Sequence, residues 1–144
     1  MKPVQLNVPH VQQREGGDCV VACAAMALDH LGVAIAYGQI KRILQTEWFG
    51  TPSFYIRKLE QLGLVVIYKR RANLQEIHEH LLNNRPGIVF VRTSELPYWS
   101  DTTDHAVVVI GLDESAVYLN DPAFPEAPPK SFAWRLWVSL VRTQ

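Results

Sequence analysis

Four polar residues of this 144-residue chain have the types and spacing that nucleophilic catalysis needs: Gln13, Cys19, His105 and Asp121. Cys19 follows the Gly-Gly-Asp run at residues 16–18, where the aspartate or the second glycine can cap a helix. We therefore expect Cys19 in the first turn of that helix, where the dipole and unpaired backbone N–H groups favour a thiolate. Cys19 is the candidate nucleophile.

A histidine and an acid are expected at the same end of a β-hairpin formed by residues 105–111 and 116–120. His105 begins the first strand and Asp121 follows the second, so we expect them to lie across from each other in cross-strand contact. A lone histidine is more often structural, but an acid at this place can hold the imidazole tautomer that accepts a thiol proton. This pairing makes His105 the candidate general base and Asp121 its orienting acid.

Gln13 and Cys23 flank the candidate nucleophile and have different expected roles. Gln13 lies six residues before Cys19, across a glycine-containing turn. Its amide, together with the backbone N–H of Cys19, can donate two hydrogen bonds to a developing oxyanion. Cys23 lies one turn further in an apolar stretch and is expected to pack in the core. Successive helix turns do not bring two Cβ atoms together, so a disulfide between the cysteines is not expected.

Neither a metal nor a cofactor is predicted. His78 and His80 are two residues apart on an expected helix, whereas ligands for one metal share a helix face at spacings of three or four. Cys19 and Cys23 have no further ligands at a recognisable spacing. A solvated helix face and a packed core therefore explain these residues better than a metal site.

Charge and composition limit the partners. The 14 basic and 14 acidic side chains balance, which leaves no excess charge for a phosphate backbone or an anionic membrane. The only basic run, residues 69–71, is typical of a solvated strand end. The apolar runs are far shorter than the ~20 residues that span a bilayer, and the N-terminus has no signal-peptide pattern. We expect a cytoplasmic protein without nucleic acid partners or membrane insertion of its own, and its oligomeric state stays open.

The elements that position these residues come as helices first and strands later. Apolar spacings of three and four, with caps or glycines at the ends, predict helices at residues 18–31, 37–45, about 52–62 and 73–83. Runs of β-branched residues predict strands at residues 64–68, 88–91, 105–111 and 116–120. This order predicts a single α+β domain over residues 1–144, with a largely antiparallel sheet.

Three other segments carry expectations. Residues 93–104 lack apolar periodicity and have the length at which a loop tends to be functional or mobile. The run Pro97-Tyr98-Trp99 within them can form an aromatic lip for an extended peptide, or equally close over the local core. The proline-rich residues 121–129 are expected to be extended, and the apolar residues from Phe132 to Val141 to form a last helical turn and strand.

The motifs in chain order form a combination that can be compared with known families. They are Gln13-x5-Cys19 with Asp18 before the cysteine, Gly50-Thr51, Leu62-Gly63-Leu64, Arg85-Pro86-Gly87, His105 to Gly111 and Asn120-Asp121-Pro122. From about Val8 to Val141 this combination resembles the C39 bacteriocin-processing peptidases, which are papain-like cysteine peptidases, and more closely their stand-alone, double-glycine peptidase-like group. The exporter-linked enzymes usually carry glycine after the cysteine, where this chain has Val20.

The resemblance implies a papain-like fold with the nucleophile on the first helix, and a peptide or protein substrate without a cofactor. It assigns Cys19 as nucleophile, His105 as general base and acid, Asp121 as orienter and Gln13 as oxyanion donor. The expected activity is proteolysis of a peptide bond through a Cys19 acyl-enzyme, with leader or precursor peptides as candidate substrates. Two alternatives stay open: a peptide-binding domain with little or no turnover, and an acyltransferase that passes the acyl group to an amine.

Overall fold

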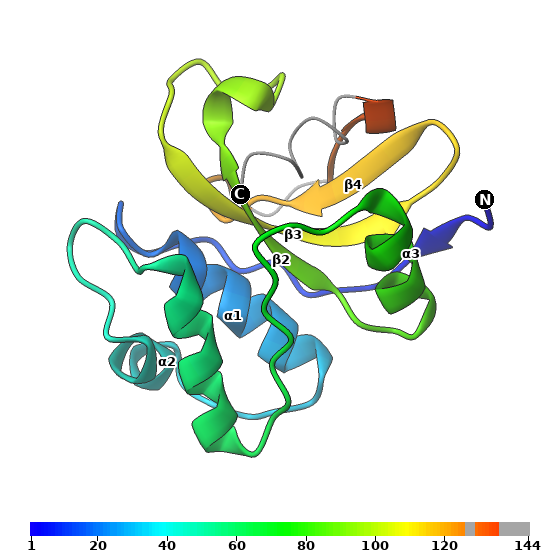
Figure 1. The fold of residues 1–144 in the computed structure, drawn as a ribbon. Helices are drawn as coiled ribbons and strands as arrows, with labels where there is room; N and C mark the ends of the chain where they lie inside the picture. Colours follow the sequence, from blue (N-terminus) through cyan, green and yellow to red (C-terminus); the bar gives the residue numbers. More distant parts are fainter. Residues whose placement is uncertain (126–128, 136–144) are drawn as a thin grey trace.

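The computed structural model describes residues 1–125 and 129–135 of the chain. Its elements, in chain order, are β1 (Val4–Gln5), α1 (Cys19–His30), α2 (Tyr37–Leu44), the 3-10 helix η1 (Ser53–Leu62), α3 (Leu74–Leu82), β2 (Gly87–Arg92), the 3-10 turn η2 (Thr93–Glu95), β3 (Asp104–Leu112), β4 (Ala116–Asn120) and β5 (Lys130–Ala133). Figure 1 shows α1, α2 and η1 gathered on one side of the sheet, with α3 apart from them beside the sheet; this is the α+β arrangement predicted from the sequence.

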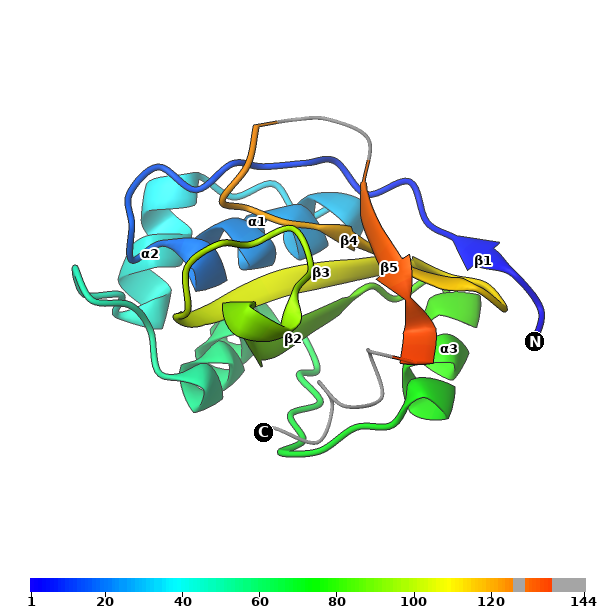
Figure 2. The same cartoon turned by 90° about the horizontal axis from the view of Figure 1, so that it is seen from above.

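The sheet is antiparallel and β3 is its central strand (Figure 2). β4 pairs with residues 108–112 of β3 and carries β5 on its far side. β2 pairs with residues 104–109 and β1 with residues 111–112, so these two strands share the other edge of β3. Every residue of β3 from His105 to Leu112 is buried. β3 is therefore a fixed support for the histidine near its beginning.

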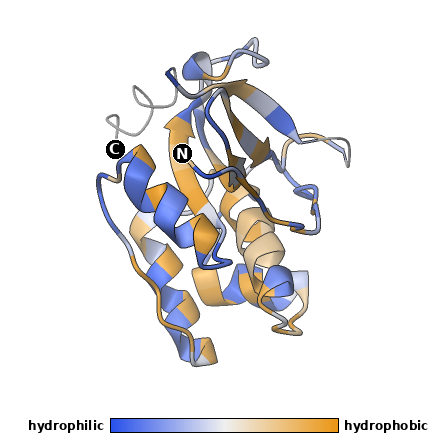
Figure 3. Cartoon of the chain, turned by 90° about the vertical axis from the view of Figure 1, so that its right-hand side faces the viewer, coloured by the Kyte–Doolittle hydropathy of each residue, from blue (hydrophilic) through white to orange (hydrophobic). Residues whose placement is uncertain are grey.

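α1 lies in the core and packs against β3 and α2. Its small side chains let the helix approach both neighbours closely. In Figure 3 the outer helices carry hydrophilic and hydrophobic bands, whereas the hydrophobic colour concentrates in the interior elements. Cys23 is fully buried here, and burial raises the pKa of its thiol, with the charges of Cys19 and Asp121 acting in the same direction. Cys23 thus packs in the core, as its apolar surroundings in the sequence predict.

Residues 64–68 do not form the predicted strand. Within the described part of the chain they pair with no other strand. Val65 and Ile67 are exposed, whereas Leu64, Val66 and Tyr68 are half-buried and pack against the core. Alternating exposure of apolar residues shows only that one side of a segment is buried. An extended segment that lies on the surface without a partner strand therefore has the same sequence pattern as a strand. The strand prediction is wrong for this reason.

Local sequence signals correctly locate the ends of two other elements. Asn73 and Glu76 form the expected capping box at the start of α3: the Asn73 side chain accepts from the Glu76 N–H at 2.9 Å, and the Glu76 carboxylate accepts from the Asn73 N–H at 3.3 Å. The helix expected after Pro52 is present as the 3-10 helix η1 and ends at Gly63, whose φ of 81° is left-handed.

The C-terminal part is described only to residue 135. A last helical turn and strand were predicted over residues 132–141. β5 occupies the beginning of that stretch, up to Ala133, and residues 136–141 lie outside the described residues. Among the described residues no helix is long and apolar enough to cross a membrane.

Candidate active site

The first residue of α1, the beginning of β3 and the segment after β4 meet at one edge of the molecule, on the left in Figures 1 and 2. Cys19 opens α1 and is half-buried, whereas Cys23 on the same helix is fully buried. His105 is the second residue of β3, and Asp121 directly follows β4. The structure thus brings three of the four predicted site residues together.

His105 and Asp121 form a buried pair, with 2.7 Å between imidazole Nε2 and carboxylate Oδ1. The strand register places Asn120 opposite Val108, so Asp121 reaches His105 diagonally and not from the directly opposite position that the hairpin prediction implied. Because Nε2 is bonded to Asp121, Nδ1 is the ring nitrogen left for Cys19.

The surroundings of His105 keep its imidazole protonated at neutral pH. Burial alone would lower the pKa, but hydrogen bonds to Asp121 and Cys19 and the charges of both groups outweigh burial and raise the pKa of His105 to about 9. An imidazolium can donate a proton to a leaving group. Its positive charge also favours the thiolate form of a neighbouring cysteine, which is the reactive form.

Two aromatic side chains complete the hydrogen bonding of Asp121. Tyr98 Oη and Trp99 Nε1 each donate to Oδ2 at 2.9 Å, and the N–H of Ala123 donates to Oδ1 at 3.0 Å. Burial would raise the pKa of Asp121, but the hydrogen bond and charge of His105 and the bonds from Trp99 and Ala123 hold it below its usual value. The carboxylate is therefore ionised at neutral pH, where His105 is protonated.

Trp99 also covers the candidate catalytic histidine. Its ring centroid lies 4.9 Å from that of His105, and Phe124 packs edge-on against Trp99 at 5.7 Å. The sequence allowed two interpretations of residues 97–99, an aromatic lip for a peptide or closure over the local core. The ring contacts of Trp99 agree with the second. The hydrogen bonds of Tyr98 and Trp99 to Asp121 were not predicted, and the signal in the sequence was the place of these residues in a long loop directly before His105.

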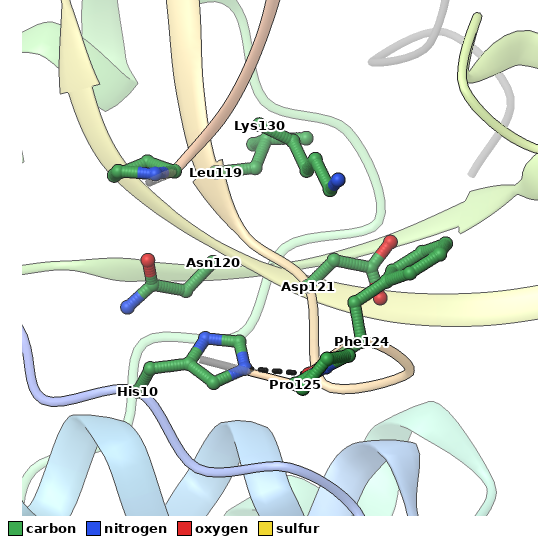
Figure 4. Close-up of a pocket in the computed structure, with 8 residues that line it drawn as sticks. His10, Leu119, Asn120, Asp121, Phe124, Pro125 and Lys130 are labelled. Atoms are coloured by element: carbon green, nitrogen blue, oxygen red, sulfur yellow. Dashed lines mark hydrogen bonds between the residues drawn. The ribbon is translucent and has the colours of Figure 1, made fainter. Parts of the chain in front are cut away.

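Residues 8–13, which precede the loop into α1, are hydrogen-bonded to the segment that carries Asp121 (Figure 4). The carbonyl of Val8 accepts from Asn120 Nδ2 at 3.1 Å, and His10 Nε2 is bonded to the Phe124 carbonyl at 2.8 Å. The N–H of Gln13 donates to the Pro122 carbonyl at 2.8 Å. These bonds fix the backbone of Gln13 next to the turn that carries Asp121.

The side chain of Gln13 lies on the loop before α1. Its Nε2 donates to the carbonyls of Glu15 and Gly16, at 3.0 and 3.2 Å, and its Oε1 is buried without a hydrogen-bond partner among the described residues. The amide therefore shapes the loop that leads into Cys19. To donate to an oxyanion, as predicted, one N–H of Gln13 must exchange a loop carbonyl for the substrate.

Asp18 precedes the nucleophile but does not cap α1 with its side chain, contrary to the expectation for this position. The carboxylate is buried and instead accepts from Tyr37 Oη at 2.9 Å and pairs with Lys41 Nζ at 2.8 Å. Because Tyr37 and Lys41 belong to α2, Asp18 fastens the beginning of α1 to its neighbouring helix. The bond is tertiary, which a local capping rule does not anticipate.

A small cavity lies next to Asp121. A cavity of about 10 Å³ behind the carboxylate, lined by His10, Asn120 and Phe124 among others, has room for about one water molecule (Figure 4). Among residues 1–125 and 129–135, no group of three or more His, Cys, Asp or Glu side chains is arranged to hold a metal ion.

Comparisons with known structures agree with this fold. An inferred C39-like peptidase from Bacillus anthracis superposes with a TM-score of 0.80, at 15% sequence identity, over 99% of this chain and 93% of that one. A double-glycine motif protease from an AMS/PCAT transporter, solved in complex with the leader peptide, gives a TM-score of 0.59 at 17% identity, over 98% and 92% of the two chains. The fold is thus that of the papain-like C39 peptidase structures.

A search of curated proteins finds no match. The model of the Peptidase C39-like family, in contrast, matches residues 5–137, which include all four candidate site residues. The chain therefore belongs to the Peptidase C39-like family.

Proposed function

We propose that this chain is a cysteine peptidase that cleaves a peptide bond through a Cys19 acyl-enzyme. The observation that carries the proposal is the buried Nε2–Oδ1 bond of 2.7 Å between His105 and Asp121, with the half-buried Cys19 on the remaining side of the imidazole. Nucleophile, proton carrier and orienting acid are the parts that acyl transfer from a peptide requires.

In the first step the Cys19 thiolate attacks the carbonyl carbon of the scissile bond. Two groups donate hydrogen bonds to the oxyanion that forms: the backbone N–H of Cys19, in the first turn of α1, and the side-chain amide of Gln13. The C–N bond then breaks while the imidazolium of His105 gives its proton to the leaving nitrogen. The products are a free amine and a thioester on Cys19.

In the second step water attacks the thioester carbonyl. His105, now neutral, takes a proton from that water, and the carboxylic acid product leaves as Cys19 is restored. Asp121 holds the imidazole through Nε2 in both steps and stabilises the imidazolium each time it forms. An amine in place of water would give acyl transfer by the same route.

Precursor peptides are the substrates to test first. The related transporter protease was solved with a leader peptide, so a segment of extended chain next to a scissile bond is the substrate class that this relationship supports. Val20 stands where the exporter-linked enzymes usually have glycine, and its side chain is buried in the core, so the peptide library must determine the sequence preference.

The proposal is tested by incubating a peptide library with the wild-type protein and with Cys19→Ala, and reading the products by mass spectrometry. We expect cleavage at defined positions by the wild type and none by the variant. A parallel run with an added amine separates hydrolysis from acyl transfer, because the transferred product has a different mass.

Alkylation gives a second measurement that needs no substrate. Iodoacetamide at pH 6–7 is expected to modify Cys19 much faster than an ordinary free thiol, whereas the buried Cys23 stays unmodified until the protein unfolds. Absence of cleavage together with slow alkylation of Cys19 contradicts the proposal.

A further inference from the structure

The β2–β3 connection, residues 93–103, begins with a buried threonine (Figure 1). Of these residues, all of which the structure describes, only Thr93 and Leu96 are buried, and the others are half-buried or exposed. Burial of an apolar leucine is favourable by itself, whereas burial of a hydroxyl costs free energy unless hydrogen bonds replace those lost to water. The hydrogen-bond partners of Thr93 therefore indicate its role.

Thr93 closes the β2–β3 connection at its base. Its hydroxyl donates to the Asp101 carbonyl at 2.6 Å and accepts from the Thr103 N–H at 2.9 Å. Its own N–H donates to the Thr103 carbonyl at 2.9 Å, and its carbonyl accepts from the Leu96 N–H at 2.9 Å. One residue thus bonds the beginning of the connection to its end, and the hydroxyl makes two of these four bonds.

The closed part of the connection carries the two aromatic donors of Asp121. The N–H of Trp99 donates to the Leu96 carbonyl at 3.1 Å, and Leu96 is bonded to Thr93 in turn. The Trp99 and Tyr98 side chains then donate to the same carboxylate oxygen, Oδ2. A chain of direct hydrogen bonds therefore connects Thr93 with the carboxylate. Closing the base of a loop also reduces the number of conformations open to the residues within it.

We infer that Thr93 is a positioning residue: its buried hydroxyl fixes the β2–β3 connection and so holds Asp121 in the orientation that binds His105. Among the described residues both donors to Oδ2 come from this connection, so a displacement of its base affects them together. Bonds to the partner of a catalytic group orient that group although they touch no reacting atom. The consequence for turnover rests on the proposed function, whereas the position of Trp99 does not.

Three variants separate the hydroxyl from the shape of the side chain. Thr93→Val keeps the branched shape and removes the hydroxyl, and Thr93→Ser keeps the hydroxyl and removes the methyl group. Ser53→Ala is the control for loss of a hydroxyl elsewhere. Ser53 begins η1 and its Oγ lies 2.8 Å from Tyr68 Oη, in elements that carry no candidate site residue.

The first measurement needs no substrate. Exchange of the Trp99 indole N–H with water is followed by NMR, and its resonance is assigned by its loss in Trp99→Phe. We expect Thr93→Val to speed this exchange about tenfold, because the loop then opens more often and leaves the Thr103 N–H without its acceptor. Thr93→Ser and Ser53→Ala should both stay within about twofold of the wild type.

The second measurement uses a peptide that the wild type cleaves. Thr93→Val should lower kcat about three- to tenfold with little change in KM, because the bound peptide keeps its contacts while the proton relay is less well oriented. Thr93→Ser should restore most of kcat. In a protein that already carries Tyr98→Phe and Trp99→Phe, the Thr93→Val change should have little further effect, since Thr93 acts through these two side chains.

Two results overturn the inference: unchanged exchange of the Trp99 indole in Thr93→Val, and a loss of kcat that is equally large with and without Tyr98 and Trp99. If Thr93→Val does not fold, Thr93→Cys takes its place, because a thiol is a weaker donor and acceptor than a hydroxyl. Equal exchange in Thr93→Cys and Thr93→Ser then overturns the inference. Faster exchange in a protein that cleaves no peptide refutes the proposed function and leaves the positioning role of Thr93 standing.

Discussion

The protein buries two carboxylates next to its candidate catalytic residues, and they are bonded in similar ways. Asp18, before α1, accepts from Tyr37 and pairs with Lys41. Asp121, after β4, accepts from Tyr98 and pairs with His105. Each carboxylate is 1–2% exposed and has one phenol and one cationic partner. The helical half and the sheet half of the site thus contain the same kind of buried cluster.

The difference lies in the pKa of the cationic partner. The hydrogen bond to Asp18 raises the pKa of Lys41 above its already high value, so the ammonium group of Lys41 keeps its proton at neutral pH. Asp121 and Cys19 raise the pKa of His105 to about 9 against the effect of burial, which leaves its proton available for transfer. A buried carboxylate with lysine fastens two helices, and one with histidine can take part in a proton relay.

The largest expected effect comes from removing the titrating partner itself. His105→Ala should lower kcat/KM by about 10³-fold or more, because neither attack by the thiol nor departure of the amine has a proton carrier. Kinetics on a peptide identified with the wild type measure this. Lys41→Met is the matched change in the helical cluster, and it should retain most activity. An active His105→Ala protein would rule out the assigned role.

Asp121→Asn should lower kcat by roughly 10²- to 10⁴-fold and also change the pH profile. The acylation step needs His105 protonated, and the Asp121 charge helps hold the pKa at about 9, so kcat/KM of the wild type should decline as pH rises through that value. Without the charge the pKa falls, and the alkaline limb should move down by roughly 1 to 3 pH units. Profiles of kcat/KM against pH, which report the free enzyme, measure the shift for both proteins.

Asp18→Asn is the control for that shift, since it removes the other buried carboxylate charge and leaves the surroundings of His105 intact. Its alkaline limb should coincide with that of the wild type. If the alkaline limb moved equally in both variants, Asp18 and Asp121 would have the same effect on the pKa of His105, and the two clusters would not differ in function.

Local sequence signals were sufficient for the sheet half of the site. The hairpin of β3 and β4 has a short connection, so the chain positions of His105 and Asp121 predict their contact with only the register left to the structure. The capping box of Asn73 and Glu76 is equally local. Both predictions depend on residues close in sequence, where turn geometry and hydrogen-bonding rules apply directly.

Tertiary contacts account for what the sequence did not predict. Tyr98 and Trp99 reach Asp121 across more than 20 residues of sequence. The loop that carries them has no apolar periodicity, so the sequence does not predict which residues it contacts. Asp18 has the sequence position of a helix cap, but Tyr37 and Lys41 on α2 take its side chain instead. Residues 64–68 have the composition of a strand and lack a partner to pair with among the described residues.

The Asp18 cluster should show its role in stability. Asp18→Asn replaces a buried carboxylate that holds a phenol and an ammonium group, and we expect the free energy of unfolding to fall by about 1 to 3 kcal/mol. Chemical denaturation followed by tryptophan fluorescence measures the change. An unchanged midpoint would show that the cluster does not fasten the two helices.

The smallest effects come from the two phenols and give the finest comparison. Tyr98→Phe and Tyr37→Phe each remove one hydrogen bond to a buried carboxylate, and each should lower the free energy of unfolding by about 1 kcal/mol. Only Tyr98→Phe should also lower kcat, by a few-fold, because Trp99 alone then holds Oδ2 of the carboxylate that orients His105. Matched denaturation and kinetic measurements on both variants separate the two roles. Equal losses of kcat would mean that Tyr37 acts on the nucleophile through Asp18 as strongly as Tyr98 acts on the histidine through Asp121, and that fastening and proton transfer are not divided between the two halves of the site.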